Sequence, residues 1–264
     1  MYETIADKFQ PLIGKKYSSK RSRARKLLLY GEQKFLSREY YQAIYAYSES
    51  IKLIPNGELP FIRRGKARYE IGDYSGAIKD FDKAFILDPA NSLGYQYKGD
   101  VLASMEQLNE AIFYYSQSIK YNPKNEVSYF KRGLVQLKLM DFKPALKDFT
   151  KAIHLNPDYI SAYNNRGNVR NEMEDYDAAI SDFSTAIKLH PRFAVAYNNR
   201  AVAKYNLGDF EGAINDYEKA IELLLKISVV YDNISLAKQK IGDFEGAIND
   251  LTSAVELNTD LTYL

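Results

Sequence analysis

The residues of this sequence that could do chemistry are arginines and aspartates at a fixed spacing. Each of the following arginines has an aspartate sixteen residues later: Arg64 and Asp80, Arg132 and Asp148, Arg166 and Asp182, and Arg200 and Asp216. An arginine beside a carboxylate could position a proton for acid–base catalysis. However, Tyr30 and Ala46 stand at the same two places thirty-four residues before the first pair, and both charges are missing there together. This joint loss favours structural ion pairs, each contributing roughly 0 to 1 kcal/mol if exposed.

Histidine and cysteine supply no second candidate for catalysis or metal binding. The sequence has two histidines, His154 and His190, and no cysteine, which excludes disulfides, thiolate zinc sites and iron–sulfur clusters. Both histidines lie near the predicted ends of helices, where a cation interacts favourably with the helix dipole. No nucleophile elbow occurs, and Gly14 and Lys15 lack the earlier glycine of a phosphate-binding loop. We therefore expect no enzymatic activity, no metal site and no cofactor.

The bulk composition is that of a folded chain with balanced charge. The 264 residues are 46% hydrophobic and 27% charged, with a net charge of +2, which excludes a disordered or collagen-like chain. No stretch approaches the roughly 18 uninterrupted apolar residues of a membrane span. Residues 1–10 carry Glu3, Asp7 and Lys8 and lack the apolar run of a secretory signal. These features predict a cytoplasmic protein without a membrane span.

Small residues and prolines recur with a period of thirty-four. Glycine stands at Gly31, Gly65, Gly99, Gly133 and Gly167, and two further steps reach Ala201 and Ser235. Alanine follows each of them twelve residues later, and the first five are followed after twenty-four residues by Pro55, Pro89, Pro123, Pro157 and Pro191. The period predicts seven copies, at residues 24–57, 58–91, 92–125, 126–159, 160–193, 194–227 and 228–261. Residues 1–23 then form a basic segment or cap helix, and residues 262–264 form a tail.

Each copy carries two runs of apolar residues spaced three and four apart, which predicts two amphipathic helices and an all-α fold. The two runs meet at Gly72-Asp73, Gly208-Asp209 and Gly242-Asp243, where glycine can adopt a left-handed conformation and aspartate can cap the second helix. The prolines end the second helix. Because one unit is too small to bury its own apolar face, the copies are expected to stack as an α-solenoid.

Half of the thirty-six aromatic residues occupy only three positions of the period. A platform for stacking bases or sugars would need aromatic rings on the surface. Repetition at fixed helical positions instead predicts core packing. One such set is Tyr47, Phe81, Tyr115, Phe149, Phe183 and Tyr217.

The pattern of large and small residues resembles the tetratricopeptide repeat family over about nine-tenths of the chain. The second copy shows it as Phe61, Gly65, Tyr74, Ala77, Phe81, Ala84 and Pro89. The resemblance implies a right-handed superhelix of antiparallel helix pairs. It also implies that the first helix of each copy lines a concave groove, and that the groove holds peptide segments of other proteins. Family members that bind the acidic tails of chaperones do so through a lysine at the fifth position of a copy. None of the seven copies here has lysine at its fifth position, which argues against such a clamp.

The groove positions implied by the resemblance divide the chain into two halves. In the first half they are apolar and cationic, and the residues expected to bind peptide are Arg63, Tyr69, Tyr97, Phe130 and Lys131. In the second half asparagine dominates, and the expected residues are Asn164, Asn165, Asn168, Asn198, Asn199 and Asn233. Asparagine is a poor helix former, so its accumulation on first helices points to a function.

Three of these asparagines share one position in successive copies, namely Asn165, Asn199 and Asn233. Stacking of the copies would align them as a ladder of amides, each offering a donor and an acceptor to a peptide backbone. The alternative is a polar helix face that codon usage has filled with asparagine.

Two segments depart from the repeat. Residues 1–23 carry a net charge of +4, which could contact phosphate on nucleic acid or a membrane, or could form a solvated tail or cap. The segment Leu223–Val230 is too apolar for a turn, and no polar helix follows the seventh copy. Because solenoids usually need such a cap, we expect self-association through Leu223–Val230 or the face that carries Leu251 and Val255, unless the chain is part of a longer one.

The sequence as a whole favours a non-enzymatic adaptor that binds an extended peptide in its concave groove. A targeting or regulatory region of a glycosyltransferase-like enzyme complex is the alternative, because family arrays with asparagine ladders occur there. An RNA-binding helical repeat is weaker, since the dense basic run lies outside the repeats.

Overall fold

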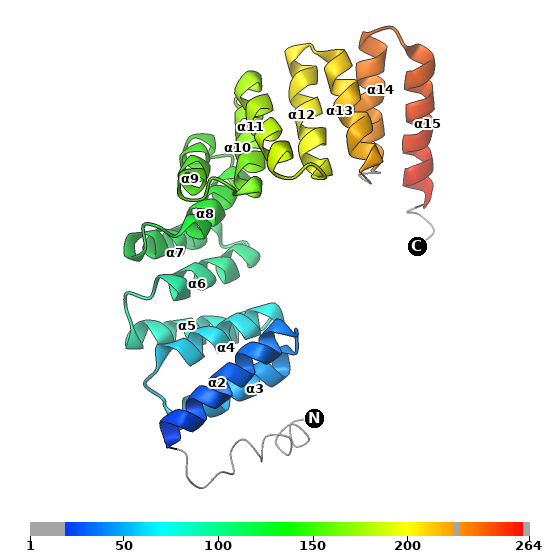
Figure 1. Cartoon of the computed structure of the whole chain (residues 1–264). Coiled ribbons are helices and arrows are strands. Elements are labelled where there is room, and N and C mark those ends of the chain that lie inside the picture. The colour runs from blue at the N-terminus through cyan, green and yellow to red at the C-terminus, as the bar shows by residue number, and fades with distance from the viewer. Residues whose placement is uncertain (1–18, 224–226, 261–264) are drawn as a thin grey trace. The chain divides into compact units, whose positions relative to one another are not determined.

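A computed structural model describes residues 19–223 and 227–260, which fall into two compact units, Met1–Val135 and Gln136–Leu264. Every regular element in these ranges is an α-helix (Figure 1). The helices of the first unit are α2 (Lys20–Leu36), α3 (Tyr40–Leu53), α4 (Glu58–Glu70), α5 (Tyr74–Leu87), α6 (Ser92–Ser104), α7 (Leu108–Tyr121) and most of α8 (Glu126–Lys138). Those of the second unit are α9 (Phe142–Leu155), α10 (Ile160–Glu172), α11 (Tyr176–Leu189), α12 (Ala194–Leu207), α13 (Phe210–Glu222), α14 (Ser228–Lys240) and α15 (Phe244–Asp260).

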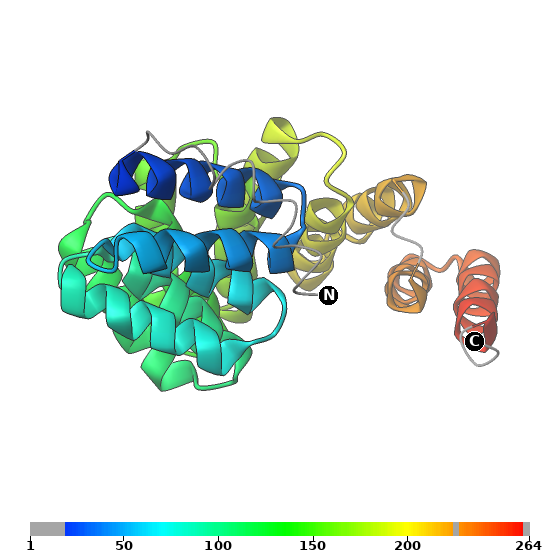
Figure 2. The same cartoon turned by 90° about the horizontal axis from the view of Figure 1, so that it is seen from below.

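The helices pack in consecutive pairs, and the pairs stack. Within the first unit α2 packs on α3, α4 on α5 and α6 on α7, while α3 and α5 also contact the helix that begins the next pair. The second unit repeats this arrangement, and both views show α14 and α15 side by side as one pair (Figures 1 and 2). The predicted all-α solenoid of paired helices is therefore confirmed. The exact repeat boundaries remain a prediction.

The two helices of a pair approach each other where a glycine faces an aromatic ring. A Cβ atom on Gly167 would lie 2.6 Å from Cε1 of Phe183, much closer than a van der Waals contact. The same relationship joins Gly31 to Tyr47, Gly65 to Phe81 and Gly99 to Tyr115. These rings are fully or almost fully buried, so the expected core role of this aromatic set is confirmed. At these four positions a Cβ atom would require the ring to shift, whereas Ala201 stands at the same position of its copy opposite Tyr217.

The turn inside each pair has a left-handed residue at one fixed position. Gly72, Gly208 and Gly242 have φ angles of 79°, 93° and 85°, and the aspartate that follows each one accepts a hydrogen bond of 2.9 Å from a backbone N–H three residues later. This confirms the predicted turn. The corresponding residues of the other four copies are also left-handed although none is glycine: Arg38, Glu106, Met140 and Glu174.

The proline-containing ends of the second helices also follow the prediction. Helix α5 ends at Leu87, and Asp88 then has an extended backbone (φ −140°, ψ 94°) directly before Pro89. Helix α11 ends in the same way at Leu189, before His190 and Pro191. The residue before a proline avoids helical geometry, which stops each of these helices at the same point of its copy.

Three of the predicted arginine–aspartate pairs join the two helices of one copy. The shortest N···O distances are 2.7 Å for Arg64 and Asp80, 2.6 Å for Arg166 and Asp182, and 2.7 Å for Arg200 and Asp216. All three aspartates are buried. The pairs are therefore structural, as expected. Because their aspartates are buried, the small contribution to stability that is typical of exposed pairs does not apply to them.

Some sequence-based expectations concern residues outside the described ranges. Residues 1–18 of the basic segment, residues 224–226 of the apolar segment and residues 261–264 belong to this group. Helix α2 begins at Lys20, with the Ser19 hydroxyl accepting a hydrogen bond of 3.2 Å from the backbone N–H of Ser22. Residues 20–23 are thus continuous with the first helix of the first pair.

Candidate functional site

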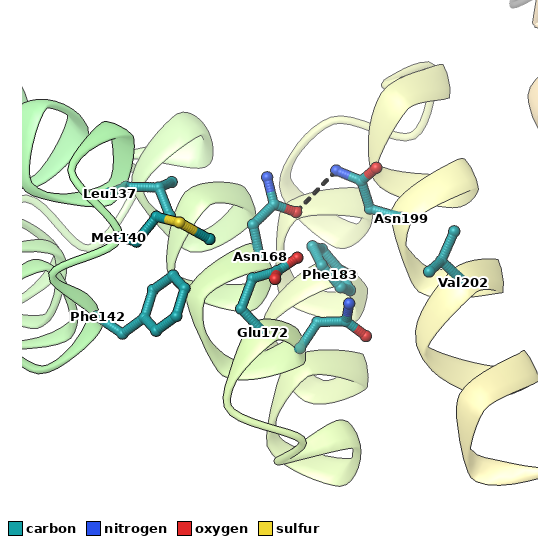
Figure 3. A pocket seen from close by; sticks show the side chains of 9 residues that line it. Leu137, Met140, Phe142, Asn168, Glu172, Phe183, Asn199 and Val202 are labelled. Atoms are coloured by element: carbon teal, nitrogen blue, oxygen red, sulfur yellow. Dashed lines mark hydrogen bonds between the residues drawn. The ribbon is translucent and has the colours of Figure 1, made fainter.

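The second unit contains a recess of about 510 Å³ between its first helices. The residues that line it are Leu137, Met140, Phe142, Asn168, Asn171, Glu172, Phe183, Asn199 and Val202. Figure 3 shows that Asn168 and Glu172 of α10 lie in the middle, with Leu137, Met140 and Phe142 on one side and Asn199 and Val202 of α12 on the other. The recess therefore combines an apolar wall with amide groups and one carboxylate.

The amides of this recess are held by one another. The side-chain nitrogen of Asn199 donates to the Oδ1 atoms of Asn168, at 3.0 Å, and Asn164, at 3.2 Å. Its own oxygen accepts from Asn198 at 3.2 Å, so both ends of the Asn199 amide are occupied. This contact fixes the Asn168 amide with its oxygen toward Asn199 and its NH₂ group turned away (Figure 3). Asn168 is thus oriented to donate hydrogen bonds to a ligand.

The other predicted asparagines have different surroundings. Asn164 is buried and accepts a hydrogen bond from Asn199, so it has almost no surface for a ligand. Asn165 donates to the backbone carbonyl of Ser161, one turn earlier in its own helix, at 2.8 Å. Asn233 is half-buried on α14. The amide contacts therefore run diagonally from α12 to α10 between different positions of two copies, instead of following the shared position of Asn165, Asn199 and Asn233.

The first unit has a smaller recess of about 240 Å³, which is lined mainly by its first helices α4, α6 and α8. Its lining residues are Tyr69, Asp100, Ala103, Ser104, Tyr115, Lys131, Leu134 and Val135. The Asp100 carboxylate accepts a hydrogen bond of 2.7 Å from the Tyr115 hydroxyl and lies 3.4 Å from the Lys131 ammonium. Burial raises the pKa of Asp100 above its ordinary value, while Lys131 and Tyr115 oppose this rise. The structure thus brings two of the predicted residues, Tyr69 and Lys131, to one polar recess.

The remaining predicted residues of the first unit are engaged within the protein. Arg63 forms an ion pair with Glu32 at 2.8 Å, and the Tyr97 ring stacks on Phe81 with their centroids 6.2 Å apart. Tyr97 also faces the Lys66 ammonium at 5.0 Å. Phe130 is only 9% exposed, which leaves little of its ring for a ligand. Of these three residues, Arg63 and Tyr97 remain partly exposed.

Several lining residues were missed from the sequence. Asp100 and Val202 stand at the ninth position of their copies, a groove position by resemblance, and this signal could have identified them. Met140 and Phe142 lie in a turn and at the start of a second helix, where no groove position predicts them. Tyr115 belongs to the core aromatic set, so its contact with a recess has no sequence signal.

No group of three or more histidine, aspartate or glutamate side chains within 19–223 and 227–260 could hold a metal ion. Across the same ranges, every helix is too short or too polar to traverse a bilayer.

Family comparisons agree with the architecture. A family model described as tetratricopeptide repeat matches residues 127–159, 160–193 and 194–224, and a second with the same description matches residues 229–261. A model described as TPR repeat matches residues 99–139, so together the matches cover more than half of the chain. The chain belongs to the tetratricopeptide repeat family. No curated protein matches it.

Several solved structures resemble the chain at low sequence identity. The MamA protein is 25% identical, with a TM-score of 0.59 over 63% of this chain and 91% of its own. YrrB, described as a TPR protein with an unusual peptide-binding site, is 24% identical, with a TM-score of 0.60 over 67% and 92%. The C-terminal part of a TPR repeat-containing protein from Cytophaga hutchinsonii is 21% identical, with a TM-score of 0.69 over 88% and 95%. The likenesses to YrrB and to the Cytophaga protein show the fold alone.

Proposed function

We propose that this chain is a non-enzymatic protein-interaction module that binds an extended segment of a partner protein along its first helices. The observation that carries the proposal is the recess of the second unit, where fixed amides lie beside an apolar wall. An extended peptide presents backbone N–H and C=O groups that need partners, together with alternating side chains that need pockets.

The chemistry of the recess fits such a ligand. The NH₂ group of Asn168 can donate to a peptide carbonyl, and the exposed carboxylate of Glu172 can accept from a peptide N–H. The side chains of Met140 and Val202 can contact an apolar side chain of the ligand. Because Asn199 holds Asn168 in place before binding, little side-chain entropy would be lost on binding.

The recess of the first unit supports the same function with a different preference. Lys131 and Asp100 place opposite charges next to the Tyr69 hydroxyl, which itself lies 2.9 Å from the Ser104 hydroxyl. Such a recess suits a polar or charged side chain of the partner. The peptide-binding site described for YrrB, a member with the same fold, is consistent with this use of the architecture.

The test is selection of peptides from a random displayed library, followed by calorimetric titration of the selected peptides. We expect wild type to select extended peptides with an apolar residue, and we expect Asn168→Ala together with Asn199→Ala to weaken their binding about tenfold, since each lost hydrogen bond contributes about 1 kcal/mol. Asn215→Ala is the matched control, because Asn215 is an exposed asparagine on the second helix α13. Equal affinity of the double variant, or failure of wild type to select any peptide, would contradict the proposal. Circular dichroism checks that all variants remain folded.

A further inference from the structure

Helix α15 exposes a continuous apolar stripe. Phe244, Ile248, Leu251 and Val255 are 66%, 63%, 40% and 61% exposed, and their spacing of four, three and four residues places them on one face of the helix. Side chains of this size at this spacing normally lie against another helix. Within the second unit, α15 is paired on one side only, with α14 (Figures 1 and 2).

The preceding copy shows what covers such a stripe. Ile214 and Tyr217 of α13 stand thirty-four residues before Ile248 and Leu251, yet they are only 9% and 2% exposed. They pack on Val230, Ile234 and Ala237 of α14, the first helix of the next pair. The α15 stripe therefore corresponds to the surface of α13 that the next first helix, α14, covers.

Helix α2 offers the complementary half. It is itself a first helix, and its exposed residues Lys26, Leu29, Gln33 and Leu36 follow one another at spacings of three, four and three. Leu29 is 60% exposed and Leu36 is 82% exposed. These two leucines supply apolar contacts at the same heptad spacing as the α15 stripe.

The charges of the two helices are opposite. Helix α2 contains six lysines or arginines and one glutamate. Helix α15 contains four acidic residues and no lysine or arginine, and one of the four, Asp250, is paired with Lys238 of α14 at 2.8 Å. Pairing of α15 with another α15 would bring acidic side chains together, which is unfavourable. Pairing of α15 with α2 would instead bring opposite charges together around the apolar contacts, which favours association and specificity.

We propose that copies of this chain associate end to end, with α2 of one copy docking on the exposed stripe of α15 of another. In this contact Lys26, Tyr30 and Gln33 of α2 take the positions that Val230, Ile234 and Ala237 of α14 take on α13, and Leu29 and Leu36 lie at the edge of the same face. Because the two surfaces are different, each molecule of a docked pair still has one unused surface, either its α2 or its α15. Further molecules can therefore add, and association is open-ended. This inference does not use the recesses and is independent of the proposed peptide binding.

Three variants of the full chain and their mixture test the proposal by sedimentation velocity. The α2 variant carries Leu29→Glu and Leu36→Glu, and the α15 variant carries Ile248→Gln and Val255→Gln. The control is Ile86→Gln, because Ile86 is 72% exposed on the second helix α5, away from both surfaces. All substituted residues are exposed, and circular dichroism verifies that helix content is retained.

We expect the average mass of wild type and of the control to rise with protein concentration and to fall with added salt. Each interface variant alone should stay monomeric, whereas an equimolar mixture should form a single dimer, since one intact α2 and one intact α15 remain. A wild type that stays monomeric at every concentration would overturn the proposal. An α2 variant that associates as strongly as wild type would also overturn it, and would point to pairing of α15 with itself or with another surface.

Discussion

Arg200 holds the carboxylate of Asp216 with two parallel hydrogen bonds, each 2.7 Å long, from Nε and Nη2. The third guanidinium nitrogen donates to the hydroxyl of Ser184 at 3.0 Å, on the second helix of the preceding copy. Lys204 lies 2.8 Å from Oδ2 of the same carboxylate, the oxygen that also accepts from Nε of Arg200. Asp216 therefore joins the two helices of its own copy through Arg200 and Lys204. Arg200 also contacts the preceding copy through Ser184.

Asp216→Ala is expected to destabilise the second unit strongly. It leaves Arg200 and Lys204 without their acceptor in a partly buried place, and losing one partner of a buried pair costs about 3 to 5 kcal/mol, or somewhat less here because the arginine is 19% exposed. The urea midpoint of unfolding, followed by circular dichroism, measures this effect. Glu222→Ala breaks the exposed pair with Lys219 and should change stability by less than about 1 kcal/mol. Similar losses for both variants would refute the structural role assigned to Asp216.

Glu174→Gly is expected to stabilise the chain. Glu174 has a φ angle of 62°, a left-handed conformation that costs an L-residue roughly 1 to 2 kcal/mol, whereas glycine adopts it freely. The greater flexibility of glycine in the unfolded chain offsets part of the gain, which leaves up to about 1 kcal/mol. Gly208→Ala, at the same position of the next copy, should lower the melting temperature. If both substitutions shift it in the same direction, backbone strain is not the controlling factor.

Gly167→Ala is expected to destabilise the chain by about 1 to 3 kcal/mol, the usual cost of overpacking. The added methyl group would lie 2.6 Å from Cε1 of Phe183, so the ring must move. The double variant Gly167→Ala with Phe183→Leu removes the clash and should recover part of the loss. Thermal unfolding of the two single variants and the double variant gives the coupling between the sites. Strict additivity would show that the glycine is not required by the ring.

The stability of the first unit is expected to depend on the ionisation of Asp100. Burial raises its pKa above the ordinary value of 3.8, so the folded state binds the proton more tightly than the unfolded state. The associated stability is fully present below pH 3.8 and is lost as the pH rises through the folded pKa. Asp100→Asn cannot ionise, yet its amide oxygen can still accept from Tyr115. The stability of this variant relative to wild type should therefore increase with pH above 3.8, as urea midpoints at several pH values would show. A constant difference would contradict this account.

Much of the fold was predictable because three of the turns inside a pair and the ends of several second helices carry local signals. Gly72 and Asp73 specify a left-handed residue and a cap, and the prolines specify where second helices end. The four left-handed residues that are not glycine had no such signal. Glu174 and its counterparts adopt this conformation because the packing of the two helices requires the same turn in every copy, and tertiary contacts override the local preference.

The candidate site was less predictable because side-chain contacts depend on the offset between neighbouring helices. A period of thirty-four suggests that Asn165 and Asn199 meet, whereas Asn199 bonds residues thirty-five and thirty-one positions earlier, Asn164 and Asn168. The sequence indicated which helix face is rich in amides. It did not indicate which amides would form hydrogen bonds within the protein and which would remain able to bind a ligand.

The contact between a glycine and an aromatic ring sixteen residues later has a consequence for how such a gene can change. Because the contact recurs with the same spacing at Gly31, Gly65, Gly99 and Gly167, a first helix from one of these four copies meets an equivalent ring in any other of the four. An in-frame recombination event that removes or adds thirty-four residues would therefore leave every remaining glycine opposite a ring. The length of the binding face can thus vary in evolution without redesign of the core.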